Sequence, residues 1–297
     1  MWFKNLKIYR FTTDFSLNTD TLQTELERMV FKPCSSQEIQ SMGFVSPVPN
    51  GELLFHAANS AIGICLKREE KILPASVVNG ELADKVKKIE FETGSPVGKK
   101  AQKDLKEDII QNLLPRAFSK SAVTNAMVLL DRQVIVVDAS SDSAAEVVLS
   151  CLRKCIDSLP VVPFVKSQQQ HILTDWLKHD APEFIELLDE AEFKSTADDG
   201  ASAKVKKQDL DADEVLAHIQ AGKLVEKIAI NYKDRLNCII AEDISIKRLK
   251  FTDLVMEQNE DIPKDEIAAK FDADFSLFSA EIAEFIDDLS KVFAEEQ

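Results

Sequence analysis

The sequence predicts an α+β protein in which antiparallel sheets pack against helices, with a projecting αα-hairpin and a C-terminal α+β domain. Short runs of alternating apolar residues near the start and again at 223–251 are typical of strands with one buried face. Between these runs, residues 77–114 have helical periodicity. With 45% hydrophobic and 29% charged residues, the 297-residue composition is that of a folded chain long enough for about two domains.

The first elements are a strand, a helix and a hairpin. Leu6 and Ile8 alternate with Lys7 and Tyr9, which predicts a strand with one solvent-facing side. A helix should follow, ended by Pro33; its expected cap is Asn18, Thr19 or Asp20, and its expected apolar stripe is Leu22, Leu26, Met29 and Val30. Two apolar runs within 53–66 flank Asn59 and Ser60, and this pattern predicts a β-hairpin.

Two helices are expected between Val77 and Leu114. Their stripes are Leu82, Val86 and Ile89 in the first helix and Ala101, Leu105, Ile109 and Leu113 in the second. Gly and Pro in TGSPVG at 93–98 separate them, so the pair should fold back as an αα-hairpin.

The second half is expected to contain another hairpin at 126–139, turning near Asp131, and a capped helix at 140–159. The segment 175–192 is expected to be polar and helical. Alternating residues predict three strands over 223–251, and the last helix should run from about Phe275 to Phe293.

Prolines at 160, 163 and 182 place a domain boundary near 165–180. We expect a central α+β domain made of residues 1–76 and 118–170, with the helical hairpin at 77–117 inserted in it as a tip. Residues 171–297 would form the C-terminal α+β domain, or base.

The net charge of −15 at first argues against a nucleic-acid partner. However, residues 253–297 contain 14 acidic and only 3 basic residues, so most of the net negative charge lies in that segment. The first 252 residues are therefore only weakly acidic.

No secretory signal or apolar run of membrane-spanning length is present, so we expect a cytoplasmic protein. Five cysteines do not suggest a disulfide framework in that compartment. Cys151 and Cys155 lie one helical turn apart, where core packing is favoured over metal binding because further ligands are missing nearby.

Enzyme signatures are not evident. The sequence lacks the glycine-rich phosphate loops and the serine elbow, and its four histidines are scattered. The acidic segment FDADF at 271–275, with Asp272 and Asp274, could in principle hold Mg²⁺ for nucleic-acid hydrolysis. The simpler interpretation is that one of these residues caps the last helix. We therefore assign no catalytic residue and no metal ligand.

Basic residues concentrate in two places. The helical hairpin carries Lys85, Lys87, Lys88, Lys99, Lys100, Lys103 and Lys106, but acidic residues dilute them, so a solvated helix face is the simpler interpretation. The C-terminal half contributes candidate nucleic-acid contacts at Lys204, Lys206, Lys247, Arg248 and Lys250. Lys204, Lys206 and Gln208 would share one strand face, with Lys207 opposite or in a turn.

Phe118 lies just beyond Pro115 in a polar segment that suggests a loop tip. Two interpretations are open for it, namely folding back into the core and an exposed contact used in association.

Over nearly its whole length, the chain resembles the RdgC family of recombination-associated proteins of proteobacteria. The segments that carry the resemblance are MWFKNLKIYR at 1–10, FKPCSSQE at 31–38, KREEKILP at 67–74, LLPRAFS at 113–119, SLPVVPF at 158–164, LLDEAE at 187–192, KKQDL at 206–210, IKRLKF at 246–251 and FDADF at 271–275. None of these is a catalytic motif.

The resemblance implies a ring-shaped homodimer around double-stranded DNA, with a basic channel and an acidic exterior. It also implies DNA binding without sequence preference, restraint of RecA-driven recombination, a link to replication fork repair, association with the nucleoid, and no cofactor. On the matching motifs, Phe118 would close a dimer interface, and Lys207 and Gln208 would contact DNA. The alternative is an acidic interaction module that acts directly on RecA or a replication protein through the C-terminal segment.

Overall fold

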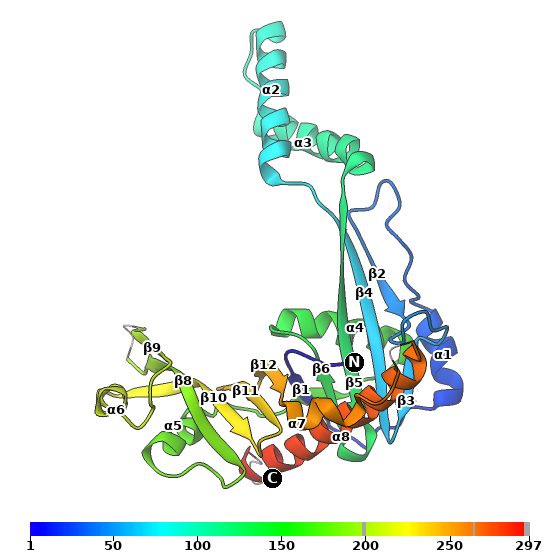
Figure 1. Ribbon diagram of the computed structural model, residues 1–297. Coiled ribbons are helices and arrows are strands. Elements are labelled where there is room, and N and C mark those ends of the chain that lie inside the picture. The colour runs from blue at the N-terminus through cyan, green and yellow to red at the C-terminus, as the bar shows by residue number, and fades with distance from the viewer. Residues whose placement is uncertain (198–199, 264, 294–297) are drawn as a thin grey trace. The chain divides into compact units, whose positions relative to one another are not determined.

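The computed structural model describes residues 1–197, 200–263 and 265–293, and the fold is α+β with two antiparallel sheets and, within these residues, eight α-helices (Figure 1). The chain divides into two compact units. Unit 1 contains residues 1–28, 46–65 and 124–297, and unit 2 contains residues 29–45 and 66–123. The α+β class with antiparallel sheets predicted from sequence is confirmed.

The larger sheet has seven strands in the order β2-β4-β5-β6-β1-β7, with β3 paired to β4. Their bounds are β1 Lys7–Phe11, β2 Gln40–Val45, β3 Phe55–Ala58, β4 Ala61–Lys71, β5 Ser119–Leu129, β6 Val134–Val137 and β7 Val161–Pro163. β4 and β5 each continue from one unit into the other. Both predicted hairpins are confirmed, with turns at Asn59 and Ser60 and at Leu130–Arg132.

The smaller sheet belongs to unit 1 and has the order β12-β11-β10-β8-β9. Its strands are β8 Ile185–Ser195, β9 Ser202–Lys206, β10 Lys223–Tyr232, β11 Leu236–Ala241 and β12 Ile246–Phe251. The three strands expected over 223–251 are therefore confirmed.

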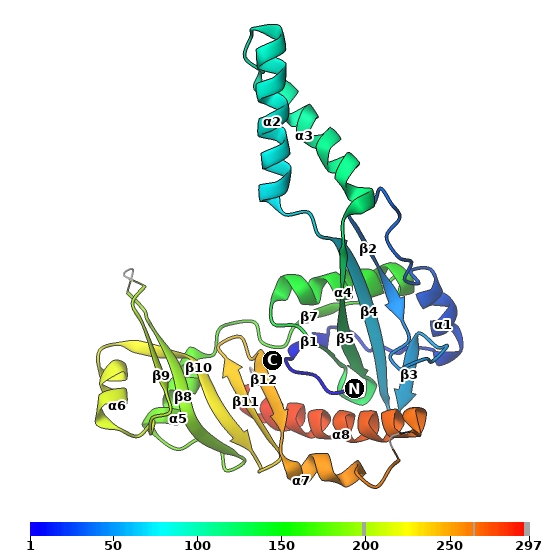
Figure 2. The same cartoon turned by 45° about the horizontal axis from the view of Figure 1, so that its top comes forward.

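Three helices of unit 1 pack against the smaller sheet and share its hydrophobic core. They are α5 Gln170–Lys178, α6 Asp213–Gln220 and α8 Ile267–Phe293 (Figure 2). Leu173 and Trp176 of α5 share a core with Phe193 and Ile228 of the sheet. The 27 residues of α8 span about 40 Å at the usual rise per residue. Along that length, Phe285 contacts Tyr232 in β10 and Phe275 contacts His56 in β3, so α8 joins the two sheets.

The remaining helices are α1 Thr19–Glu27, α4 Asp142–Ile156 and α7 Asp253–Met256 in unit 1, and α2 Ala75–Thr93 and α3 Lys99–Leu113 in unit 2. Asn18 and Ser141 cap α1 and α4 as predicted. α2 and α3 contact each other, which confirms two helices in the predicted segment. Cys151 and Cys155 are buried in α4, as expected for core packing, and burial raises the pKa of the Cys155 thiol to about 11.

Four local predictions are wrong. The first strand has no solvent-facing side, because Lys7 and Tyr9 are both buried. Lys7 pairs there with Asp142 and Asp243, which compensates for removing its charge from water. α1 ends at Glu27 rather than at Pro33, since Met29 and Phe31 instead hydrogen-bond to Phe44 in β2.

The segment predicted to be helical up to residue 192 forms strand β8 from Ile185 onward. Its Leu, Glu and Ala residues favour helices locally, but Ala191 and Phe193 complete the core face of the smaller sheet and tertiary packing prevails. The last helix begins at Ile267, so Asp272 and Asp274 lie inside it and do not cap it.

Among the described residues, no helix has both the length and the apolar content needed to cross a bilayer.

Candidate nucleic-acid interface

The strand register of the smaller sheet places most of the predicted basic contacts on one face. Side chains directly opposite each other across paired strands share a face. Glu190 lies opposite Lys206 and Glu192 opposite Lys204, and Lys227 lies opposite Glu192 on the other side. Further along, Lys250 of β12 lies opposite Asn237 of β11, and Asn237 lies opposite Asn231 of β10. This set of residues, together with Arg248, is called the polar sheet face below.

Arg248 reaches this face because β12 is irregular. The pairing of β11 with β12 shifts register between Asn237 and Ile239, and Arg248 has a left-handed φ of 53°. Such a bulge redirects a side chain away from the regular alternation. From the edge strand β12, the Arg248 side chain extends past β11 and β10. Its guanidinium lies 2.7 Å from Glu190 Oε2 on β8.

Three cations therefore surround one carboxylate. Besides Arg248, the ammonium groups of Lys206 and Lys204 lie 3.5 and 3.7 Å from Glu190 Oε1. The Glu190 side chain is only 13% exposed, whereas those of Lys204, Lys206 and Arg248 are 48%, 52% and 57% exposed. Burial on its own raises the pKa of the Glu190 carboxyl, but the three cations outweigh it and the pKa lies below its usual value.

A second carboxylate, that of Glu192, lies on the same face and has different partners. It forms ion pairs with Lys204 and with Lys227, and the Lys227 side chain is 27% exposed. Four cations and two carboxylates thus form one connected cluster with an excess of positive charge. Opposite charges across paired strands also help to fix their register.

The other predicted contacts lie in three different settings. Lys247 is on β12 and half-buried. Lys207 follows the end of β9 in a left-handed turn with a φ of 54°, so the alternative that placed it in a turn is confirmed. Gln208 does not share the strand face with Lys204 and Lys206, because β9 ends at Lys206 and the Gln208 amide hydrogen-bonds to Glu214.

Sequence reasoning missed Glu190, Glu192 and Lys227. The LLDEAE motif contained both carboxylates, but their partners depend on the pairing of β8, which was expected to be helical. Lys227 was part of a predicted strand, and its alternation with the apolar residues Ile228 and Ile230 was the available signal.

Unit 2 carries the remaining candidates. Phe118, between α3 and β5, is 85% exposed, so the alternative of an exposed side chain is correct and the folded-back alternative is wrong. Phe91 on α2 is 92% exposed and was not singled out from the sequence. The hairpin lysines are exposed except for half-buried Lys106, and the single ion pair found for them within the described residues joins Lys103 to Glu107.

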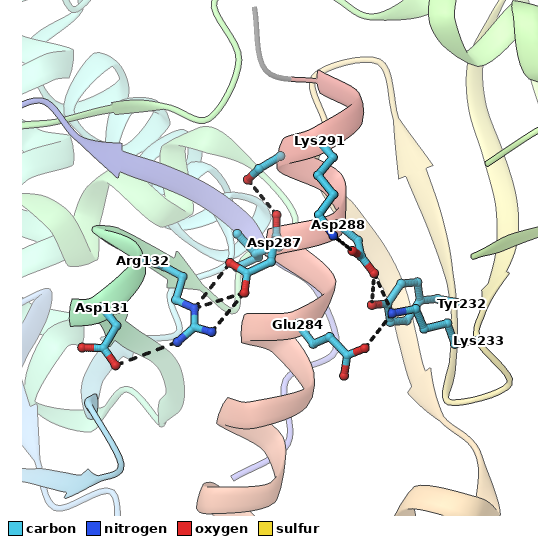
Figure 3. Close-up of polar contacts among 10 residues, drawn as sticks. Asp131, Arg132, Tyr232, Lys233, Glu284, Asp287, Asp288 and Lys291 are labelled. Carbon is cyan, nitrogen blue, oxygen red and sulfur yellow. Dashed lines mark hydrogen bonds and ion pairs between the residues drawn. The ribbon is translucent and has the colours of Figure 1, made fainter. Parts of the chain in front are cut away.

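The acidic C-terminal helix uses its carboxylates internally (Figure 3). Asp287 binds Arg132 of the 130–132 turn, and Asp288 accepts a hydrogen bond from Tyr232 and pairs with Lys233 and Lys291. The further pairs are Glu284 with Lys233, Glu281 with Arg235, Asp274 with Lys270 and Asp272 with His56. These contacts fix α8 to both sheets.

Asp272 and Asp274 do not form a metal site with each other and further ligands. Across the residues that the structure describes, no three His, Cys, Asp or Glu side chains gather in a way that could hold a metal ion.

Comparison with known proteins identifies the family. A family model described as "Putative exonuclease, RdgC" matches residues 1–296. The chain belongs to the RdgC family. Curated relatives named recombination-associated protein RdgC include those of Pseudoalteromonas atlantica, 49% identical over 99% of this chain and 98% of the relative, and Psychromonas ingrahamii, 45% identical over 100% and 99%. The relative from Proteus mirabilis is 41% identical over 100% and 99%.

The two descriptions of the RdgC family differ on enzymatic activity. The family model names an exonuclease, whereas the curated relatives are named for recombination and their names state no catalytic role. Association with recombination is the function that both the resemblance and these names support.

Proposed function

We propose that this RdgC-family chain is a non-enzymatic protein that binds double-stranded DNA without sequence preference. The observation that carries the proposal is the polar sheet face, where predicted contacts from β9 and β12 converge on one side of one sheet. Lysine and arginine side chains on strands suit phosphate oxygens, which are the same at every base pair. Neutralising phosphates releases counterions, so affinity should depend steeply on salt.

The assembly that we propose is a ring-shaped homodimer that encircles the duplex, with Phe118 at one interface and another interface in the C-terminal domain. The Phe118 side chain is 85% exposed and offers an apolar surface that suits a hydrophobic contact between copies. In this arrangement residues 1–76 and 118–170 form the central domain, 77–117 the tip and 171–297 the base. DNA occupied by the ring would hinder RecA from extending its filament, which links the protein to replication fork repair on the nucleoid in the cytoplasm.

The alternative mechanism is direct binding of RecA or a replication protein by the acidic C-terminal segment. The ion pairs of α8 argue against it, because five of its carboxylates already have lysine or arginine partners within the chain and a sixth, Asp272, contacts His56. The α8 carboxylates are therefore already engaged within the chain and offer little to a basic partner.

The test neutralises two cations of the polar sheet face. A Lys206→Gln/Arg248→Gln variant should bind a 30-base-pair duplex at least tenfold more weakly than the wild type in fluorescence anisotropy and restrain RecA strand exchange correspondingly less. The control is Lys154→Gln/Lys178→Gln, which removes two exposed lysines on α4 and α5. Equal loss in both variants would refute the sheet face as the DNA site.

Loss of DNA affinity with full restraint of RecA would favour the acidic module. The nuclease suggested by the family description is tested separately by incubating supercoiled and linear DNA with Mg²⁺. Intact DNA is the expected result, and degradation that copurifies with the protein would overturn the non-enzymatic proposal.

A further inference from the structure

Glu190 differs from Glu192, the other carboxylate of the polar sheet face, in how exposed its cationic partners are. Lys227 is 27% exposed and stays beside Glu192 within the sheet. Arg248 and Lys206 are each more than half exposed, and Glu190 is the one carboxylate that the described residues offer to either of them. These two long side chains can therefore turn outward without leaving any other anion unpaired.

A phosphodiester can replace Glu190 as a partner for these side chains. Both carboxylate and phosphate present two oxygens that match the planar fork of a guanidinium. The Glu190 Oε1 atom is buried without a hydrogen bond, and the two lysines near it lie at 3.5 and 3.7 Å. The carboxylate thus gathers the cations while leaving their hydrogen-bonding capacity incompletely used.

We propose that Glu190 is a built-in counter-ion that DNA phosphate displaces from Arg248 and Lys206. In the free protein Glu190 keeps three like charges within reach of one another and lowers the net charge of the face. When a duplex binds, a phosphate takes over Arg248, and Lys206 follows it outward. Glu190 then remains paired with Lys204. Breaking its ion pairs with Arg248 and Lys206 makes the net free energy of DNA binding less favourable. This inference rests on the proposed function, because it assigns a role to Glu190 within that DNA site.

The exchange predicts that removing the internal anion strengthens DNA binding. Glu190→Gln keeps the size of the side chain and frees one additional positive charge for phosphate. At 0.1 M salt this variant should bind a duplex about three- to tenfold more tightly than the wild type, and the slope of log affinity against log salt should steepen by about 0.9 per chain. A purely structural role for Glu190 would instead weaken binding and leave the slope unchanged or shallower.

Glu52→Gln is the matched control. Glu52 is exposed in the segment before β3, outside the smaller sheet, and within the part of the chain that the structure describes it forms no ion pair. The control changes net charge equally, but the salt slope should remain that of the wild type, since distant exposed charges are screened beyond about 10 Å at 0.1 M salt.

A double-variant cycle tests whether the gain passes through Arg248. In an Arg248→Gln background, Glu190→Gln should strengthen binding by less than half as much, on a logarithmic scale, as it does in the wild type. Wild-type protein that binds no DNA would overturn the proposed function. Wild-type protein that binds DNA, with Glu190→Gln binding no more tightly or showing the same slope as Glu52→Gln, would overturn the exchange alone.

Discussion

The Asp288 carboxylate should be a main anchor of α8, and its replacement by asparagine tests how the acidic helix is held. Asp288 Oδ2 accepts the Tyr232 hydroxyl hydrogen at 2.7 Å and lies 2.7 Å from the Lys233 ammonium, while Oδ1 lies 2.7 Å from that of Lys291 (Figure 3). The Tyr232 side chain is fully buried and that of Asp288 is 7% exposed. Both oxygens of the Asp288 carboxylate thus have hydrogen-bonding or ion-pair partners.

Asp288→Asn should lower the free energy of unfolding by about 2 kcal/mol near pH 7. Asparagine still accepts from Tyr232, but the bond changes from charge-assisted to neutral, a difference of about 1 kcal/mol. Loss of the partly exposed Lys233 pair adds about 1 kcal/mol after screening, and the Lys291 pair adds little because that lysine is 71% exposed. Urea unfolding followed by tryptophan fluorescence measures the difference.

The difference in unfolding free energy between the wild type and Asp288→Asn should depend on pH. Burial on its own raises the pKa of the Asp288 carboxyl, but hydrogen bonds from Lys233, Lys291 and Tyr232 outweigh it and hold the pKa well below its usual range. A depressed pKa contributes stability above the unfolded value of about 3.9, and this contribution is lost as the pH falls toward the folded value. The difference between wild type and Asp288→Asn should therefore be constant from pH 5 to 8 and shrink below about pH 4.

Asp287→Asn is the control, because it makes the same change one residue earlier. Asp287 is 44% exposed and pairs with Arg132, so its loss should cost under about 1 kcal/mol. Equal effects of the two variants, or an Asp288 effect that is undiminished at pH 3, would refute the reasoning.

Four further variants test other parts of the molecule. Lys207→Ala should weaken binding to all duplexes alike and make the salt slope shallower by about 0.9 per chain, whereas Gln208→Ala should lower affinity by the order of one hydrogen bond without changing the slope; identical slope changes in anisotropy titrations would contradict this. Phe118→Ala should weaken self-association in sedimentation equilibrium without lowering the melting temperature, because the side chain is 85% exposed; an unchanged dimerisation constant would remove Phe118 from the interface. Gly63→Ala would place a Cβ 2.8 Å from the Phe275 ring and should cost about 1–3 kcal/mol in thermal unfolding; unaltered stability would show that the ring moves freely.

The fold could be predicted wherever the apolar pattern decides the element. Alternation and turn residues located β3, β4 and β10–β12, and capping residues located α1 and α4, since these signals are local. β8 could not be predicted in the same way, because Glu190 and Glu192 suit a strand only when Lys204 and Lys206 lie opposite them. That pairing joins segments more than ten residues apart.

Sequence reasoning identified the cations of the candidate site other than Lys227 and missed both of its carboxylates. Basic residues in KKQDL and IKRLKF stood out from an acidic sequence, but nothing local indicated that Arg248 lies beside Glu190. The bulge that redirects Arg248 depends on how β11 and β12 pair. Phe91 was missed because its exposure is determined by which face of α2 packs against α3.

The central claim is sequence-independent binding of double-stranded DNA through phosphate contacts, and a salt titration tests it most directly. The wild-type protein would be titrated against two unrelated duplexes of equal length from 50 to 300 mM salt. We predict affinities that agree within about threefold and fall together along a linear log–log plot, with a slope of about −0.9 for each phosphate neutralised. Binding to neither duplex at 50 mM salt, or a strong preference for one of them at equal salt, would contradict the account.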